Sequence, residues 1–161
     1  MSSPLAFGLI GAGWIGSFHA ETLARRLPNA RLVAAADPVP GAAERLSTPR
    51  SYRDPLELIA DPSVEAVAIS SPAASHADLV VAAAHAGKHV FCEKPVAVDG
   101  PGVRSVLESA RRAKEQQLAL MSGFCWRYST RERETYKRIH EGAIGPLVAV
   151  YTNYNATGWI E

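Results

Sequence analysis

The chain of 161 residues has only two cysteines, Cys92 and Cys125, which lie far apart in the sequence. Such a pair implies neither a disulfide framework nor a metal site, and we expect a reducing, cytoplasmic setting. No uninterrupted apolar stretch approaches the ~18 residues of a membrane span, and the first residues lack the basic start and apolar core of a signal peptide. The formal net charge is only +1. We therefore expect neither nucleic acid nor an anionic membrane as a partner.

Short apolar runs alternate with helical patterns along most of the chain, which predicts βαβ units and an α/β fold with a doubly wound parallel sheet of the Rossmann type. The expected strands are Leu5–Ile10, Arg31–Ala36, Val64–Ser70, His89–Cys92 and Leu118–Gly123. The expected helices are Trp14–Leu27, a short one at Ala42–Leu46, one capped by Asp54, one from Ser75 to Gly87, Val103–Gln116 capped by Asp99, and a charged one from Ser129 to about Gly142. Ser75 with Asp78, and Ser129 with Glu132, have the spacing of capping boxes.

A glycine-rich loop, Gly11-Ala12-Gly13-Trp14-Ile15-Gly16, follows the first expected strand directly and opens the first expected helix. In such a unit Gly11 allows the tight turn, Gly13 lets the backbone approach a pyrophosphate, and Gly16 lets the helix pack closely on the sheet. The helix N-terminus offers free N–H groups and a partial positive charge to the phosphates. The loop therefore predicts a dinucleotide site.

Asp37 closes the second expected strand and strengthens this prediction. A carboxylate at that point can accept hydrogen bonds from the adenosine ribose hydroxyls, and it would repel a 2′-phosphate. We therefore expect NAD, with NADP disfavoured. Arg45, Arg50 and Arg53 follow downstream and could bind such a phosphate, although surface arginines are usually just solvated.

The second informative stretch is Gly87-Lys88-His89-Val90-Phe91-Cys92-Glu93-Lys94-Pro95, which places a lysine at the carboxyl edge of the sheet, where ligands of open α/β sheets bind. Together with the glycine loop, Asp37, and Ser71-Pro72 with His76, it resembles the Gfo/Idh/MocA family of nicotinamide-dependent oxidoreductases. The resemblance covers essentially the whole chain, as the N-terminal domain of the family and the first step into its C-terminal domain. It implies a sugar- or inositol-like polyol as the substrate.

The resemblance implies roles for matching positions only. Lys94 would lie beside the nicotinamide and act on the substrate hydroxyl, Glu93 would help to hold the cofactor and orient Lys94, and the Lys94–Pro95 peptide would be cis. The family adds an aspartate and a histidine from its C-terminal domain, to which no residue here is assigned. The expected cofactor-binding residues are Gly11, Ala12, Gly13, Trp14, Ile15, Gly16, Asp37, Ser71, Pro72, His76, Glu93 and Lys94.

A catalytic role for Lys94 also follows from the chemistry of alcohol oxidation, independently of the family resemblance. Oxidation of a secondary alcohol removes the hydroxyl proton while hydride leaves the same carbon. A lysine with an ordinary pKa near 10.4 is a poor base at neutral pH, but burial and a nearby cationic nicotinamide would favour its neutral form. We hypothesise that Lys94 is the general base.

Several side chains keep two interpretations open. His76 either faces the cofactor or is an ordinary exposed histidine, and Arg127 with Tyr128 either lie near the substrate pocket or pack between domains. Cys92 is expected in the core rather than as a nucleophile. The remaining histidines are expected to be structural or solvent-facing: His19, His85, His89 and His140.

The last residues of the chain indicate how it divides into domains. Leu147 to Tyr154 is rich in β-branched and aromatic residues, which predicts one more strand. We therefore expect a Rossmann domain over 1–125, and over 126–161 a connecting helix and the first strand of an otherwise absent C-terminal domain. An unpaired strand there would promote self-association into a homo-oligomer.

Two functions remain open at this point. One is hydride transfer to or from a polyol, with this chain as the cofactor-binding portion, which alone would bind NAD(H) without turnover. The other is a dinucleotide-binding module without catalysis, such as a redox sensor or a truncated remnant. A methyltransferase that binds S-adenosylmethionine on a similar sheet is disfavoured by the Glu93-Lys94-Pro95 triplet.

Overall fold

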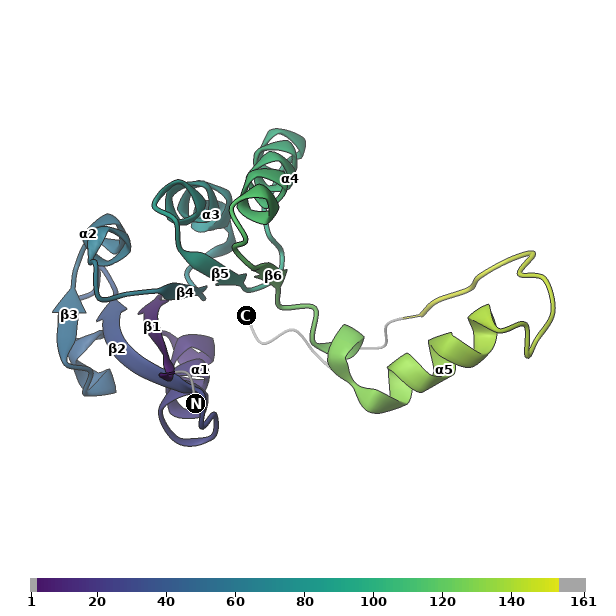
Figure 1. The fold of residues 1–161 in the computed structure, drawn as a ribbon, viewed down its shortest axis with the longest axis horizontal. Helices are drawn as coiled ribbons and strands as arrows, with labels where there is room; N and C mark the ends of the chain where they lie inside the picture. The colour runs from purple at the N-terminus through teal and green to yellow at the C-terminus, as the bar shows by residue number, and fades with distance from the viewer. Residues whose placement is uncertain (1–2, 154–161) are drawn as a thin grey trace. The chain divides into compact units, whose positions relative to one another are not determined.

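The computed structural model describes residues 3–153, and the chain divides into two compact units, 1–123 and 124–161, which are treated separately below. The first unit is built on a parallel sheet of six strands in the order β3-β2-β1-β4-β5-β6. Figure 1 shows α2, α3 and α4 on one face of this sheet and α1 on the other. This is the strand order of a dinucleotide-binding doubly wound fold, and it confirms the predicted class.

The strands are β1 (Leu5–Ile10), β2 (Ala30–Ala36), β3 (Arg50–Tyr52), β4 (Ala66–Ile69), β5 (His89–Cys92) and β6 (Leu120–Ser122). The α-helices are α1 (Trp14–Arg25), α2 (Pro55–Ala60), α3 (His76–His85), α4 (Gly100–Glu115) and α5 (Thr130–His140). Three 3₁₀ turns lie between them: η1 (Glu44–Leu46), η2 (Ala73–Ser75) and η3 (Cys125–Tyr128).

The core lies on both faces of the central strands, because their side chains alternate between the two helical layers. Leu9 of β1 packs with Ala20 and Leu23 of α1 on one face. Its neighbour Ile10 belongs to the larger cluster on the other face, with Leu58 of α2 and others. All four residues of β4 are buried, as expected for a strand covered on both sides.

Two of the predicted helix caps are confirmed. The Asp54 carboxylate accepts a hydrogen bond from the Leu56 N–H at 2.8 Å, with Pro55 at the first helical position. The Asp99 carboxylate accepts one from the Gly102 N–H at 2.7 Å, and α4 begins at Gly100, three residues earlier than expected.

Ser75 and Ser129 directly precede α3 and α5 as predicted, but neither side chain makes the hydrogen bond of a capping box, for different reasons. Ser75 ends the 3₁₀ turn η2, so its backbone is already helical (φ −94°, ψ −7°), whereas a capping residue needs an extended backbone. Its hydroxyl instead donates to the Pro72 carbonyl oxygen at 2.9 Å. The Ser129 hydroxyl donates to the Glu132 carboxylate and accepts no helix N–H.

Two further elements differ from the sequence expectation. The strand β3, which pairs with the last residues of β2, is not predicted because Arg50-Ser51-Tyr52 contains no apolar run. The helix expected at Ala42–Leu46 is only the single turn η1. Both elements lie between β2 and α2 in the sequence.

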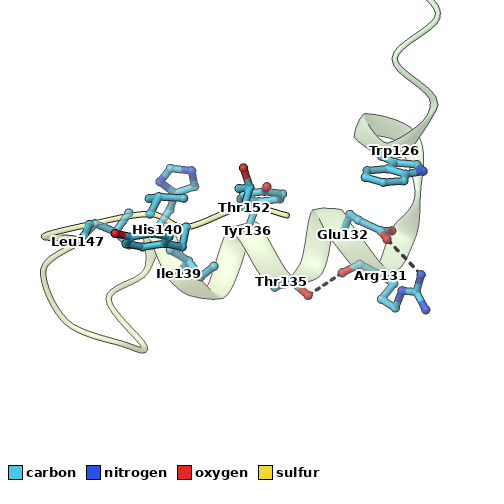
Figure 2. Close-up of a pocket in the computed structure, with 12 residues that line it drawn as sticks. Trp126, Arg131, Glu132, Thr135, Tyr136, Ile139, His140, Leu147 and Thr152 are labelled. Atoms are coloured by element: carbon cyan, nitrogen blue, oxygen red, sulfur yellow. Dashed lines mark hydrogen bonds and ion pairs between the residues drawn. The ribbon is translucent and has the colours of Figure 1, made fainter. Parts of the chain in front are cut away.

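In the second unit, α5 follows η3, and the strand expected at Leu147–Tyr154 is wrong over residues 147–153; Tyr154 lies outside the described residues. A strand needs a hydrogen-bonding neighbour, and within residues 3–153 no strand pairs with this segment. Residues 147 and 149–152 instead help line a hollow of about 740 Å³ with α5 (Figure 2). The self-association predicted from an unpaired strand loses its basis over the described part of this segment.

No helix among residues 3–153 is long and apolar enough to cross a membrane. Over the same range, no group of three or more histidine, cysteine, aspartate or glutamate side chains could hold a metal ion.

Candidate active site

The glycine loop connects β1 to α1 at the point where the strand order reverses. Gly11 has φ +91°, a conformation that L side chains rarely adopt, and its N–H donates to the Ala36 carbonyl oxygen of β2 at 2.8 Å. A Cβ on Gly11 would lie 2.6 Å from the Ser71 backbone nitrogen and 2.7 Å from the Ser70 carbonyl carbon. Only glycine therefore fits between β2 and the residues that follow β4.

The other two glycines of the loop serve different purposes. A Cβ on Gly16 would lie 1.8 Å from the Gly11 carbonyl oxygen, so the absence of a side chain lets α1 pack on the turn. A Cβ on Gly13 would meet no protein atom within 4 Å. The protein itself gives no packing reason for glycine at position 13, so the open space before α1 is available to a ligand.

The N-terminus of α1 has unused hydrogen-bond donors. No side chain caps it, and its first turn contains no acidic residue. Helices leave their first N–H groups without an intrahelical partner, and these attract anions. Trp14, at the first helical position, is 84% exposed. The loop and helix thus have the geometry of a phosphate site.

Asp37 holds the loop as well as bordering it. One carboxylate oxygen, Oδ2, accepts a hydrogen bond from the Ala12 N–H at 2.7 Å, and Oδ1 accepts one from the Val39 N–H at 2.9 Å. Each carboxylate oxygen can accept a second bond. The side chain can therefore fix the glycine loop and still receive hydroxyl groups of a ligand.

A cleft of about 730 Å³ opens above these residues, at the carboxyl edge of the sheet. Most of the predicted cofactor residues line it: Gly11, Gly13, Trp14, Ile15, Asp37, Ser71 and Pro72. Ala12 and Gly16 lie buried within the loop itself. The cleft is large enough for part of a dinucleotide and has the apolar walls typical of small-molecule sites.

A smaller hollow of about 150 Å³ is lined by the other predicted residues, Lys94, Glu93 and His76. Ile15, Ser70 and Ser71 line both hollows, so the two are neighbours. Lys94 is exposed here, so the burial expected to favour its neutral form is wrong. The Lys94–Pro95 peptide is cis, as the family resemblance implies. The structure thus brings the glycine loop and the Glu93-Lys94-Pro95 triplet to one place.

His76 is buried, with 2% of its surface exposed, so the exposed interpretation is wrong. Its Nδ1 lies 2.6 Å from the Pro95 carbonyl oxygen and its Nε2 lies 2.8 Å from the Ser71 carbonyl oxygen. Because carbonyl oxygens only accept, a neutral imidazole with one N–H can donate to just one of them. His76 therefore joins the segments after β4 and β5, and a contact with the cofactor stays a prediction.

His19 contacts the triplet from the opposite side, and sequence reasoning missed this. Its Nε2 lies 2.9 Å from Glu93 Oε1, although 74 positions separate the two residues. The available signal is that His19 lies three positions after Gly16, on a part of α1 close to the sheet, next to the buried Ala20. The sequence indicates only a structural or solvent-facing role for it.

The thiol of Cys92 lies in the hydrophobic core. Cys92 is fully buried, and burial, with a further contribution from the negative charge of Glu93, raises its pKa to about 12. A thiol in this state is neither a nucleophile nor a metal ligand. This confirms Cys92 as a core residue.

Arg127 and Tyr128, the weakly predicted substrate residues, lie in η3 of the second unit. Both are exposed, and the Arg127 guanidinium lies 5.9 Å from the centre of the Phe124 ring. The hollow of that unit has apolar walls from Tyr136 and Ile139, and Figure 2 shows Arg131 paired with Glu132 at its other end. A substrate role for Arg127 and Tyr128 stays a prediction.

Comparison with known proteins agrees with the family resemblance found in the sequence. A family model described as an oxidoreductase family with an NAD-binding Rossmann fold matches residues 5–124. The inositol 2-dehydrogenase/D-chiro-inositol 3-dehydrogenase of Lactiplantibacillus plantarum is 34% identical over 156 residues, which are 93% of this chain and 44% of that protein.

Solved structures show the same relationship. The scyllo-inositol dehydrogenase of Lactobacillus casei, with NAD(H) and scyllo-inositol bound, has a TM-score of 0.77 at 28% identity, over 89% of this chain and 43% of that one. A 3-ketoreductase from Actinomadura kijaniata, in complex with TDP-benzene and NADP, has a TM-score of 0.74 at 29% identity, over 89% and 46%. The chain spans less than half the length of these relatives.

Proposed function

The chain belongs to the Gfo/Idh/MocA family of oxidoreductases with an NAD-binding Rossmann fold, and from this premise we propose that the protein at its full natural length transfers a hydride between NAD(H) and a secondary alcohol of an inositol- or sugar-like polyol. The observation that carries the proposal is the position of Lys94. It lines a hollow that shares Ile15, Ser70 and Ser71 with the glycine-loop cleft. The Glu93-Lys94-Pro95 triplet thus lies next to the cleft in which we propose that the dinucleotide binds.

NAD(H) fits the residues of the cleft. The open space at Gly13 and the free N–H groups of α1 would receive the pyrophosphate, and Asp37 would accept hydrogen bonds from the ribose hydroxyls. When bound, the nicotinamide supplies the hydride acceptor or donor. Ser71, Pro72, His76 and Glu93 would complete the cofactor-binding site.

NAD is the cofactor we propose in preference to NADP. The Asp37 carboxylate would repel a 2′-phosphate. Arg50 is paired with the buried Asp61 carboxylate at 3.2 Å, and Arg53 lies 3.4 Å from the Pro38 carbonyl oxygen. Both guanidinium groups therefore have other partners, which leaves Arg45 as the remaining downstream candidate for binding a 2′-phosphate.

Lys94 would act as the general base for alcohol oxidation and as the acid for the reverse reaction. Its neutral amine would take the hydroxyl proton as hydride leaves the same carbon, so both electrons of the C–H bond go to the nicotinamide and the alcohol becomes a ketone. The family resemblance also implies an aspartate and a histidine in the active site, and no residue of the given sequence is assigned to either role.

The test compares Lys94→Ala with Lys114→Ala, an exposed lysine on α4 that serves as the matched control. With NAD and a panel of inositols and sugars, Lys94→Ala should lower kcat by roughly a hundredfold or more while NADH affinity stays within about threefold. Lys114→Ala should behave as the unmodified protein. Unchanged turnover in Lys94→Ala would refute the proposed role, and NADH binding without turnover on any polyol would favour a non-catalytic module.

We also propose that the protein works in the cytoplasm, and its oligomeric state can be tested directly. Both cysteines are free thiols, one buried and one exposed, which fits a reducing cytoplasm. Light scattering at several concentrations tests whether the protein forms a homo-oligomer.

A further inference from the structure

The Glu93 carboxylate is held on three sides. Its Oε1 lies 2.9 Å from His19 Nε2, and its Oε2 accepts a hydrogen bond from the Lys94 backbone N–H at 3.1 Å. A Cβ on Gly123 would lie 3.1 Å from both the Glu93 carboxyl carbon and Oε2. The missing side chain at Gly123 therefore leaves the space that the carboxylate occupies.

His19 is itself fixed in place. Its ring packs edge-on against Phe91 of β5 with 5.3 Å between ring centres, and it lies 6.0 Å from the Phe18 ring. The side chains of His19 and Glu93 are only 21% and 19% exposed. A carboxylate only accepts, so Nε2 must carry the proton in this contact. Partial burial strengthens the bond relative to one in water.

Lys94 follows Glu93 directly in the sequence, and both residues line the same small hollow. A carboxylate within about 4–6 Å of an amine favours its charged form by roughly one to three pH units, and an ammonium group cannot accept a proton from an alcohol. Within residues 3–153 the Glu93 carboxylate makes its only ion pair with His19, and none joins it to Lys94.

We infer that His19 is a positioning residue, which holds the Glu93 carboxylate over Gly123 and away from the Lys94 amine, so that Lys94 can take up a proton. The inference rests on the proposed role of Lys94. Because His19 lies on α1, the helix that begins at the glycine loop also fixes the triplet. Two further titratable groups lie beside the triplet. His76 contacts the Pro95 carbonyl oxygen, and within residues 3–153 no hydrogen bond or ion pair joins it to the Glu93 carboxylate. The buried Cys92 thiol donates to the Glu93 backbone carbonyl oxygen at 3.3 Å and not to the carboxylate.

The experiment measures the pH dependence of Lys94 labelling by acetic anhydride, read at the peptide level by mass spectrometry, in the protein at its natural length. It needs no substrate, so it can fail or succeed independently of the turnover test. Lys114 in the same sample is the internal control. His19→Leu removes the polar contact but keeps an apolar side chain against Phe91, whereas the longer amide of His19→Gln can still donate to Glu93.

In His19→Leu we expect the midpoint of Lys94 labelling to move up by about one pH unit, which is roughly tenfold slower labelling at a fixed pH below the midpoint. His19→Gln should stay close to the unmodified protein, and the Lys114 curve should not move. His19→Asn, whose amide is shorter, replaces His19→Leu if the leucine variant fails to fold. An unchanged Lys94 curve in His19→Leu, or an equal change in His19→Gln, would overturn the inference.

Discussion

The geometry of the loop predicts that alanine at Gly13 changes the stability of the fold little, whereas alanine at Gly16 lowers it. Gly13 has an extended backbone with φ −70° and ψ −165°, and its added Cβ would meet no protein atom. Glycine is a better N-cap residue than alanine, so the change costs roughly 0.5–1 kcal/mol there, but alanine also restricts the unfolded chain, which gains about 0.4–1 kcal/mol. Gly13→Ala should therefore change the free energy of unfolding by less than about 0.5 kcal/mol.

Gly16→Ala should instead destabilise the fold. Its Cβ would lie 1.8 Å from the Gly11 carbonyl oxygen, and real Cβ atoms essentially never come within 3.0 Å of another heavy atom, so the helix or the turn must move by at least 1.2 Å. Forcing extra atoms into a packed contact typically costs about 1–3 kcal/mol. The atom it meets belongs to the backbone and cannot turn aside as a side chain would.

Although Gly13→Ala should change the stability little, it should weaken nucleotide binding. If a pyrophosphate oxygen approaches its backbone, a methyl group in that space removes a charge-assisted hydrogen bond worth about 1.5–3 kcal/mol, or roughly a 10- to 150-fold weaker Kd. Urea denaturation followed by circular dichroism gives the stability, and titration of NADH fluorescence gives the affinity. A Gly13→Ala protein that binds NADH within threefold of the original would refute the assignment of this space to the ligand.

Three further predictions follow from other residues. Asp37→Ser should raise the NADPH-to-NADH affinity ratio by roughly tenfold or more, because it removes a negative charge from the ribose site; an unchanged ratio in parallel titrations would show that Asp37 does not select the cofactor. Burial raises the pKa of the Asp61 carboxyl, but hydrogen bonds from Ser63 and Tyr52 and the nearby Arg50 charge together lower it below its ordinary value of 3.8. Asp61 therefore stabilises the fold above that pH, so Asp61→Asn should lose about 2 kcal/mol in denaturation at pH 7, and the difference should shrink as the pH falls below 3.8. An aromatic disulfide reagent should titrate one thiol of the native chain at pH 8, the exposed Cys125, and the second, buried Cys92 only after unfolding; two fast thiols in the native protein would contradict its burial.

The fold was predictable because the local signals of this chain agree with its global arrangement. The glycine loop after β1, the apolar run that becomes β4 and the caps at Asp54 and Asp99 each indicate the same alternation of strands and helices. β3 was not predictable, because an edge strand of three residues needs no apolar run and forms only where β2 offers hydrogen bonds. The segment after Leu147 shows the converse, since strand composition without a partner strand yields no strand.

The sequence predicts those residues of the candidate site that belong to local motifs. Gly11–Gly16, Asp37 and Lys94 could be assigned because each belongs to a local pattern with a known physical purpose. The contact between His19 and Glu93 joins two such patterns across 74 positions, and no spacing rule relates them. Gly123 was equally hidden, since only the folded sheet brings its missing side chain beside the Glu93 carboxylate.

The two histidines around the triplet differ in how far the sequence reveals their contacts. His76 follows Ser71-Pro72 closely, its ring is buried and both ring nitrogens face backbone carbonyl oxygens, so its contact with the cofactor stays a prediction. His19 has no motif of its own, yet its ring nitrogen holds the carboxylate next to Lys94. If the first N–H groups of α1 bind phosphate as proposed, a displacement of that helix would disturb both the cofactor and the contact between His19 and Glu93. The helix that follows the glycine loop is therefore the element on which both halves of the proposed reaction depend.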